Sequence, residues 1–136
     1  HACVLRRCHD IVGDNKIFQF GIRSGDREEF VFAQKHTFMN KFNFDGLSKA
    51  VQKIGQNPVY FTLDLDVLDP SEFPGTGTPE AGGVSFTQLL GAVSEVSKLN
   101  IVGFDINELS PVYDQTGRST ALACKLLREI LLSFYR

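Results

Sequence analysis

The chain has 136 residues, of which 43% are hydrophobic and 22% are charged, and its formal net charge at pH 7 is −2. This composition is that of an ordinary soluble globular domain, and the charge balance gives no reason to expect a nucleic-acid partner. No apolar run approaches the roughly 18 residues of a membrane span, and no charged and then apolar leader opens the chain, so we expect a cytoplasmic protein with no membrane partner.

The cysteines form no recognisable metal or disulfide pattern. The chain has three cysteines, Cys3, Cys8 and Cys124. Because this number is odd and no two of them form a Cys-x-x-Cys pair, a disulfide framework is not expected. Cys3 and Cys8 lie near His9, but the spacing fits no zinc pattern, so we interpret these residues as packing side chains of a helix. Because the chain starts at His1, within what reads as structure, we expect a fragment of a longer protein.

The first third of the chain predicts a helix, a strand and a second helix. Residues 2–12 carry apolar residues at helical spacing, residues 17–22 have the composition of a strand, and residues 26–36 have that of a helix. Residues 37–44 are ambiguous between a loop and a short strand. We interpret His36 as a surface or hydrogen-bonded residue, because an isolated histidine is more often that than a ligand.

The middle of the chain predicts a helix and then a strand that ends in acids. Residues 45–54 form an amphipathic pattern with Asp45 as the expected N-cap. Residues 59–65 are rich in β-branched and aromatic residues, which is typical of a short strand buried on both faces in a parallel sheet. Asp64 and Asp66 lie at the carboxyl end of this strand.

These two aspartates indicate a cation site. Side chains alternate along a strand, so the carboxylates of Asp64 and Asp66 should project from one face, roughly 7 Å apart. Two like charges repel, and burying them requires a neighbouring cation. Hard oxygen ligands suit Mg²⁺ or Mn²⁺, and ligands of α/β sheets bind beyond the carboxyl ends of the strands. The alternative is that the two aspartates only cap the following turn.

The next part of the chain predicts a helix and another buried strand. Residues 85–98 begin with Ser85 and Gln88 at the spacing of a capping box. Residues 101–106 follow as a strand, and Glu108 comes two residues after its end. Since the carboxyl ends of parallel strands meet at one edge, Glu108 should face the same crevice as the two aspartates.

Residues 117–136 predict a closing helix with an apolar stripe, which we expect to consist of Ala121, Cys124, Leu127, Leu131 and Phe134, broadened by Leu126 and Ile130. Helices alternating with strands imply parallel strands joined by right-handed crossovers. The fold class expected is therefore α/β, with a layered α-β-α arrangement around a parallel sheet.

One long string in the chain resembles a family signature. Residues 63–70, Leu-Asp-Leu-Asp-Val-Leu-Asp-Pro, precede residues 74–83, Pro-Gly-Thr-Gly-Thr-Pro-Glu-Ala-Gly-Gly. This string resembles the ureohydrolase family, the arginases and agmatinases, and looks most like the agmatinase branch. The resemblance covers nearly the whole chain but only part of the family's fold, so it implies that residues 1–136 are the C-terminal half of one arginase-like α/β domain.

The resemblance implies hydrolysis of a guanidino C–N bond with release of urea, with agmatine converted to putrescine and urea at two Mn²⁺ ions. It implies that Asp64 bridges the two metal ions and that Asp66 binds one of them. Glu108 would accept hydrogen bonds from the substrate guanidinium, and Thr78 would lie near that group, unless it is only a turn residue. His1 would act as a proton shuttle.

Three further acids have less specific interpretations. We interpret Asp69 as bonding its own turn before Pro70, and Asp105 as supporting a strand end. Glu80 is a weaker candidate for contact with the far end of the substrate.

The match also lacks part of the family pattern. The family's remaining metal ligands, a histidine and an Asp-x-His-x-x-x-Asp cluster, lie upstream of the matched region, and this sequence contains no such string. The alternatives are therefore a non-catalytic fragment or paralogue that acts as a binding or assembly subunit, or arginase, guanidinobutyrase or formimidoylglutamase activity. The acid pair alone would also fit a Mg²⁺-dependent transferase. The family assembles as trimers or hexamers, so a homo-oligomer that acts on a small guanidino substrate is expected.

Overall fold

A computed structural model describes residues 4–135, in which helices and strands alternate along the chain. The elements are α1 (Val4–Val12), β1 (Phe18–Ile22), α2 (Arg27–His36), β2 (Phe38–Lys41), α3 (Leu47–Ile54), β3 (Pro58–Asp64), the 3₁₀ turn η1 (Leu65–Val67), α4 (Phe86–Val96), β4 (Asn100–Asn107), the 3₁₀ turn η2 (Pro111–Tyr113) and α5 (Arg118–Phe134). The α/β prediction is confirmed, and the ambiguous segment after α2 contains a short strand.

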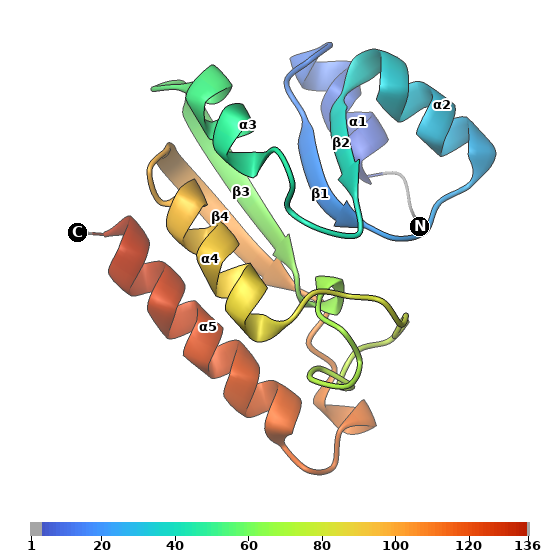
Figure 1. The fold of residues 1–136 in the computed structure, drawn as a ribbon, viewed down its shortest axis with the longest axis vertical. Helices are drawn as coiled ribbons and strands as arrows, with labels where there is room; N and C mark the ends of the chain where they lie inside the picture. The colour runs from blue at the N-terminus through green and yellow to red at the C-terminus, as the bar shows by residue number, and fades with distance from the viewer. Residues whose placement is uncertain (1–3, 136) are drawn as a thin grey trace.

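The strands are parallel, as predicted, but within residues 4–135 they form two separate pairs instead of one continuous sheet. β1 pairs with β2, and β3 pairs with β4. Figure 1 shows α1 and α2 beside the first pair, whereas α3, α4 and α5 lie along the second. β1 and β3 thus each pair with the strand that follows the next helix, as in a βαβ crossover. The connection through α3 places β3 away from the first pair.

The main core lies between β3–β4 and the helices that cover them. Along β3, Phe61 and Leu63 point into this core, while Tyr60 and Thr62 point out of it, and Tyr60 is 64% exposed. The prediction of a strand buried on both faces is therefore wrong for the described residues, because one face of this sheet has no covering layer. The buried cluster comprises Leu63, Leu65, Val67, Leu68, Phe73, Val84, Leu89, Val93, Ala123, Leu126 and Ile130.

The closing helix α5 buries only part of the predicted stripe: Leu126 and Ile130, which broaden it, are buried as expected, but most of its central residues are not. Its buried residues are Ser119, Ala123, Leu126 and Ile130. Leu127 and Leu131, which we expected in the stripe, are 40% and 43% exposed. Both sets of residues have helical spacing, so periodicity alone could not choose between them. Contact with β3 and β4 decides which face of α5 is buried. Phe134 packs edge-on against Phe61 of β3 and Phe104 of β4.

Helix starts were predicted with mixed success. Ser85 and Gln88 form the expected capping box of α4. The expected cap of α3 is wrong, since Gly46, at φ 83°, occupies the N-cap position instead of Asp45. Gly46 is favoured there because an L side chain is strained at positive φ.

Two other features bear on the sequence predictions. Cys8 and Cys124 are exposed free thiols, so the interpretation of Cys8 as a packing residue is wrong, while Cys3 lies outside the described residues. None of the helices in residues 4–135 is long and apolar enough to cross a lipid bilayer.

Candidate metal and substrate site

The two aspartates lie at a turn and not along one extended strand. β3 ends at Asp64, and the chain then enters the 3₁₀ turn η1, where the Asp66 backbone N–H donates to Asp64 Oδ1 at 3.1 Å. Leu65 is fully buried, and this anchors the turn in the core. The expected alternation of the two aspartates along a strand is therefore wrong. Asp64 does cap the following turn, as the alternative interpretation predicted.

The acids at this end of the sheet interact electrostatically. Partial desolvation raises the pKa of Asp64 to about 6, with further increases from the Asp66 carboxyl and from the charge of Glu108. The Asp66 backbone N–H opposes these effects by stabilising the charged form. Asp64 remains open to solvent, which screens part of the interaction. The result is a concentration of negative charge that a cation would relieve.

Glu108 reaches the same region from the neighbouring strand. Asp64 pairs in register with Asn107, so Glu108 is the next residue beyond the end of β4. Its φ is 65°, in the left-handed region that residues other than glycine rarely adopt, and such a conformation costs on the order of 1–3 kcal/mol. A Cβ placed on Gly77 would lie 3.9 Å from Glu108 Oε2, so the Pro/Gly loop passes beside this carboxylate.

The Pro/Gly loop is fixed by contacts that the sequence analysis missed. Gly75 donates its backbone N–H to Ser119 Oγ at 2.9 Å, and its carbonyl accepts the Ser110 backbone N–H at 2.7 Å. A Cβ on Gly75 would lie 2.7 Å from Ser119 Cβ, which explains why glycine is needed there. Thr76 is buried, whereas Thr78, the predicted substrate neighbour, is exposed on the same loop.

The start of α5 is held by a buried carboxylate. Asp114 accepts the Ser119 backbone N–H at 2.7 Å and both the backbone N–H and the hydroxyl of Thr116, at 3.1 and 2.5 Å. These hydrogen bonds, that of Ser119 first, keep the pKa of Asp114 well below its usual range. Asp114 therefore positions Ser119, which in turn holds the Pro/Gly loop at Gly75.

Asp69 and Asp105 have the structural roles that the sequence predicts. Asp69 accepts backbone N–H groups from Ser71 at 3.0 Å and from Gly82 and Gly83 at 2.9 and 3.2 Å, and its hydrogen bonds, those of Ser71 first, lower its pKa to about 2. It therefore joins both ends of the Pro/Gly loop. Asp105 accepts the Thr62 hydroxyl across the β3–β4 pair at 2.7 Å.

Arg23 is a functional candidate that the sequence analysis missed. Its guanidinium follows β1, and it donates to the carbonyl of Val67 at 2.9 Å and to the carbonyl of Asp66. Its neighbour Ser24 donates to the two carboxylate oxygens of Glu80 at 2.7 and 2.6 Å. Arg23 thus holds the turn that carries Asp66. Glu80 bonds to the end of β1, an arrangement that the sequence did not suggest.

The aspartate pair has suitable chemistry for part of a metal site. Carboxylate oxygens are the donors that Mn²⁺ and Mg²⁺ prefer. Within residues 4–135, Asp64, Asp66 and Glu108 do not form a group of three ligand atoms close enough together to hold a metal ion, either with one another or with other His, Cys, Asp or Glu side chains. The two aspartates therefore supply a partial ligand set. The remaining predicted site residue, His1, lies outside the described residues.

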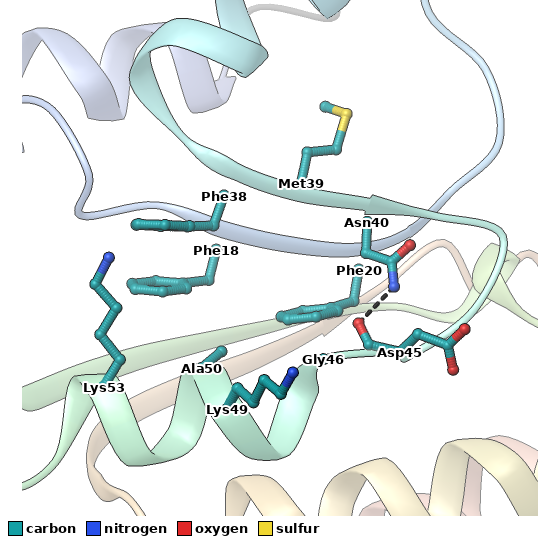
Figure 2. Close-up of a pocket in the computed structure, with 10 residues that line it drawn as sticks. All are labelled: Phe18, Phe20, Phe38, Met39, Asn40, Asp45, Gly46, Lys49, Ala50 and Lys53. Carbon is teal, nitrogen blue, oxygen red and sulfur yellow. Dashed lines mark hydrogen bonds between the residues drawn. The ribbon is translucent and has the colours of Figure 1, made fainter.

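A separate pocket lies elsewhere in the molecule, and none of the predicted site residues lines it. It has a volume of about 280 Å³ and lies between the β1–β2 pair and α3 (Figure 2). Phe18 and Phe38 stack there at 4.7 Å between ring centroids, and Lys53 Nζ lies 3.7 Å from the centroid of Phe38. Lys49 and Lys53 place positive charge at its edge, which disfavours a cationic guanidino group there.

Known proteins resemble this chain over its whole length. A sequence model of the arginase family matches residues 1–133. The agmatinase of Bacillus cereus is 41% identical over 141 residues, an alignment that takes in 100% of this chain and 48% of the relative. A solved structure from Clostridium difficile, provisionally assigned as an agmatinase, has a TM-score of 0.94 at 54% identity and is matched over 98% of this chain and 50% of its own.

A second solved structure, the agmatine ureohydrolase of Thermoplasma volcanium, has a TM-score of 0.84 at 38% identity, with 99% of this chain and 47% of its own covered. This chain therefore spans about half the length of the relatives that it matches.

Proposed function

The chain belongs to the arginase family and has part of its α/β fold, and from this premise we propose that it contributes half of a metal-dependent ureohydrolase site. The reaction proposed is hydrolysis of a guanidino C–N bond with release of urea, and the proposed substrate is agmatine, which would give putrescine. The observation that carries the proposal is the placement of Asp64, Asp66 and Glu108 at the same end of the β3–β4 pair, in a chain whose similar relatives are agmatinases.

The proposed cofactor is a pair of Mn²⁺ ions. Asp64 and Asp66 would hold them through hard carboxylate oxygens, together with the family's histidine and its Asp-x-His-x-x-x-Asp cluster, which this sequence does not contain. When bound, two such ions lower the pKa of water and so make a nucleophile available at neutral pH. In this proposal, residues 1–136 are the C-terminal half of one domain.

Glu108 is proposed to bind the substrate. A guanidinium is a planar cation, and a carboxylate can accept two parallel N–H hydrogen bonds from it. The carboxylate of Glu108 accepts no hydrogen bond from the other described residues, so it is available to a ligand. Its positive φ and the neighbouring Pro/Gly loop fix the direction in which the chain turns at Glu108 after the end of β4. Thr78 near the guanidinium and His1 as a proton shuttle remain predictions, as do the trimer or hexamer and the cytoplasmic location.

The test is urea release from agmatine, arginine and 4-guanidinobutyrate by purified protein that contains the whole of this domain, first treated with a chelator and then supplied with Mn²⁺, because residues 1–136 hold only part of the proposed ligand set. We expect urea from agmatine only after Mn²⁺ is restored, and none from an Asp66→Asn variant. Asp10→Asn, on the exposed helix α1, is the control and should behave as the parent. If none of the three compounds releases urea in a metal-dependent manner, the proposal is wrong and the alternative of a binding or assembly subunit is favoured.

A further inference from the structure

A second group of ligand-type side chains lies at the opposite end of β1 from the candidate site. His9 is in α1, Asp14 is in the segment between α1 and β1, and His36 is the last residue of α2. Asp14 precedes the start of β1, whereas Arg23, which bonds to the Asp66 turn, follows its end. The two groups are therefore at opposite ends of β1. The ureohydrolase proposal makes no use of His9 or His36.

The three side chains converge on one point. Asp14 Oδ1 lies 2.7 Å from His9 Nε2 and 2.7 Å from His36 Nδ1, and the three ligand atoms all lie within 4.8 Å of one another. Two imidazole nitrogens and one carboxylate oxygen form a common donor set for divalent first-row transition metals. The predicted hydrogen-bonded state of His36 is confirmed, but the partner it shares with His9 was not foreseen.

The backbone fixes Asp14 between the two histidines. The Gly13 backbone N–H donates to the His9 carbonyl at 2.9 Å, and the Asn15 backbone N–H donates to the His36 carbonyl at 2.8 Å. Gly13 and Asn15 adopt positive φ values of 79° and 60°, which turn the chain sharply on both sides of Asp14. The residue that supplies the oxygen is thus tied to both residues that supply the nitrogens.

Aromatic contacts orient the two rings. Phe32 stacks on His36 at 4.4 Å between centroids and meets the edge of His9 at 4.9 Å. The side chains of His9 and His36 are 15% and 33% exposed, whereas that of Asp14 is 58% exposed. The nitrogens are sheltered and the carboxylate faces water, so solvent can supply further ligands. Arg6, whose guanidinium lies over Phe32 at 4.4 Å, is paired with Asp10 at 3.4 Å.

We propose that His9, Asp14 and His36 bind a divalent transition metal ion, for which Zn²⁺ is the natural probe, and that this ion joins α1 to α2. Zinc–nitrogen bonds are about 2.0–2.1 Å long, so tetrahedral ligand atoms lie roughly 3.3 Å apart. Widening the two 2.7 Å contacts of Asp14 by about half an ångström would bring them to this spacing. The exposed Asp14 side chain can make this adjustment while Phe32 keeps the rings in place.

The test uses the protein carrying Asp64→Asn and Asp66→Asn, so that the other acid pair does not take up the probe. We expect Zn²⁺ titration by calorimetry to show one site, and Zn²⁺ to raise the melting temperature. Co²⁺ at the same site should give visible absorption bands of a tetrahedral nitrogen–oxygen set. Adding His36→Gln should weaken Zn²⁺ binding at least about tenfold, since loss of an outer-shell partner alone costs 10- to 100-fold.

Asp10→Asn is the matched control, because Asp10 is a carboxylate on the same helix as His9 but pairs with Arg6 and Arg7 instead. It should leave Zn²⁺ affinity unchanged. Equal weakening by Asp10→Asn and His36→Gln would show attraction to general negative charge and would overturn the proposal. So would the absence of saturable Zn²⁺ binding, or binding that His36→Gln does not weaken. None of these results depends on urea release, so failure here is distinct from failure of the ureohydrolase proposal.

Discussion

Hydrogen bonding separates the structural carboxylates of this chain from those that are free to bind a ligand. Asp69 and Asp114 each accept three or more hydrogen bonds from neighbouring N–H and O–H groups. Asp64 accepts one backbone N–H, and Glu108 accepts none from the described residues. A carboxylate without donors in a negative region gains most from a cation. The sequence predicted the structural role of Asp69, which lies directly before a proline, but it gave no role to Asp114, whose hydrogen bonds depend on the turn that leads into α5.

Arg23 was missed for a related reason. Its partners are backbone carbonyls of Asp66 and Val67, more than 40 positions away, and no sequence pattern identifies a backbone partner at that distance. An arginine after a strand looks like an ordinary surface residue until the fold is known.

The first prediction concerns the division of roles between Asp66 and Glu108. Asp66→Asn should weaken Mn²⁺ binding at least tenfold and abolish urea release, because it removes a proposed ligand. Glu108→Gln should keep Mn²⁺ affinity within about a factor of two and lower kcat/KM by about 10²-fold, a typical loss for one electrostatic contact. Free Mn²⁺ measured by EPR, beside the urea assay, checks both. Similar Mn²⁺ losses in the two variants would contradict the assignment.

The second prediction concerns Arg23→Met, which keeps the bulk of the side chain and removes two hydrogen bonds from a charged donor. We expect the free energy of unfolding to fall by about 2 kcal/mol, because each such bond contributes about 1.5–3 kcal/mol and part is recovered by solvation. Mn²⁺ affinity should fall as well, since the Asp66 turn loses its support. Arg27→Met, at the exposed start of α2, is the control for loss of charge. Urea denaturation and Mn²⁺ titration are the measurements, and stability loss with unchanged Mn²⁺ affinity would limit Arg23 to a structural role.

At the scale of elements, the sequence predicts well which helices and strands exist, but it predicts poorly which face of each one is buried. The capping box of α4 and the helix and strand order are local properties, and they were predicted. The exposed face of β3, the buried face of α5 and the turn at Asp66 depend on which other element packs against them. A periodic pattern defines a stripe but does not say which of two adjacent stripes meets the sheet.

The third prediction tests the face of α5 with two adjacent leucines. Leu126 is fully buried, and Leu127 is 40% exposed. Leu126→Ala should lower the free energy of unfolding by about 2–5 kcal/mol because it leaves a cavity. Leu127→Ala should change it by less than about 1 kcal/mol, because surface substitutions are usually small. Chemical denaturation of both variants is the measurement. The reverse order of losses would mean that the centre of the predicted stripe, at Leu127, faces the core instead of Leu126.

The fourth prediction concerns the contact between the Pro/Gly loop and α5. Gly75→Ala should destabilise the protein by about 1–3 kcal/mol, because its Cβ would overlap Ser119. Gly91→Ala in α4 is the matched control: its Cβ would meet nothing within 4 Å, and alanine favours a helix by about 1 kcal/mol. It should therefore leave stability unchanged or raise it. Thermal denaturation distinguishes the two, and equal shifts would mean that the close approach has no energetic cost.

At the scale of the whole molecule, the acids affect stability in opposite directions as pH changes. Asp69 and Asp114 have lowered pKa values, so their stabilisation is complete above the ordinary aspartate pKa near 4 and is lost as pH falls below it. Asp64 has a pKa raised to about 6, so its contribution is complete below pH 4 and is lost as pH rises through 6.

The fifth prediction follows from these opposite signs. In the presence of EDTA, the free energy of unfolding should be greatest between about pH 4 and 5 and should fall on both sides, since Asp64 loses its proton above this window and the structural aspartates gain theirs below it. Asp64→Asn should remove the fall toward pH 7 and keep the fall toward pH 2, whereas Asp114→Asn should reduce the acid limb only. Mn²⁺ at pH 7 should restore stability to the parent and not to Asp64→Asn. Denaturation curves across pH 2–8 check each part. A parent curve that rises steadily to pH 7 without metal would show that neither desolvation nor the neighbouring acids raise the pKa of Asp64 in the folded protein, and it would remove the electrostatic reason for a cation there.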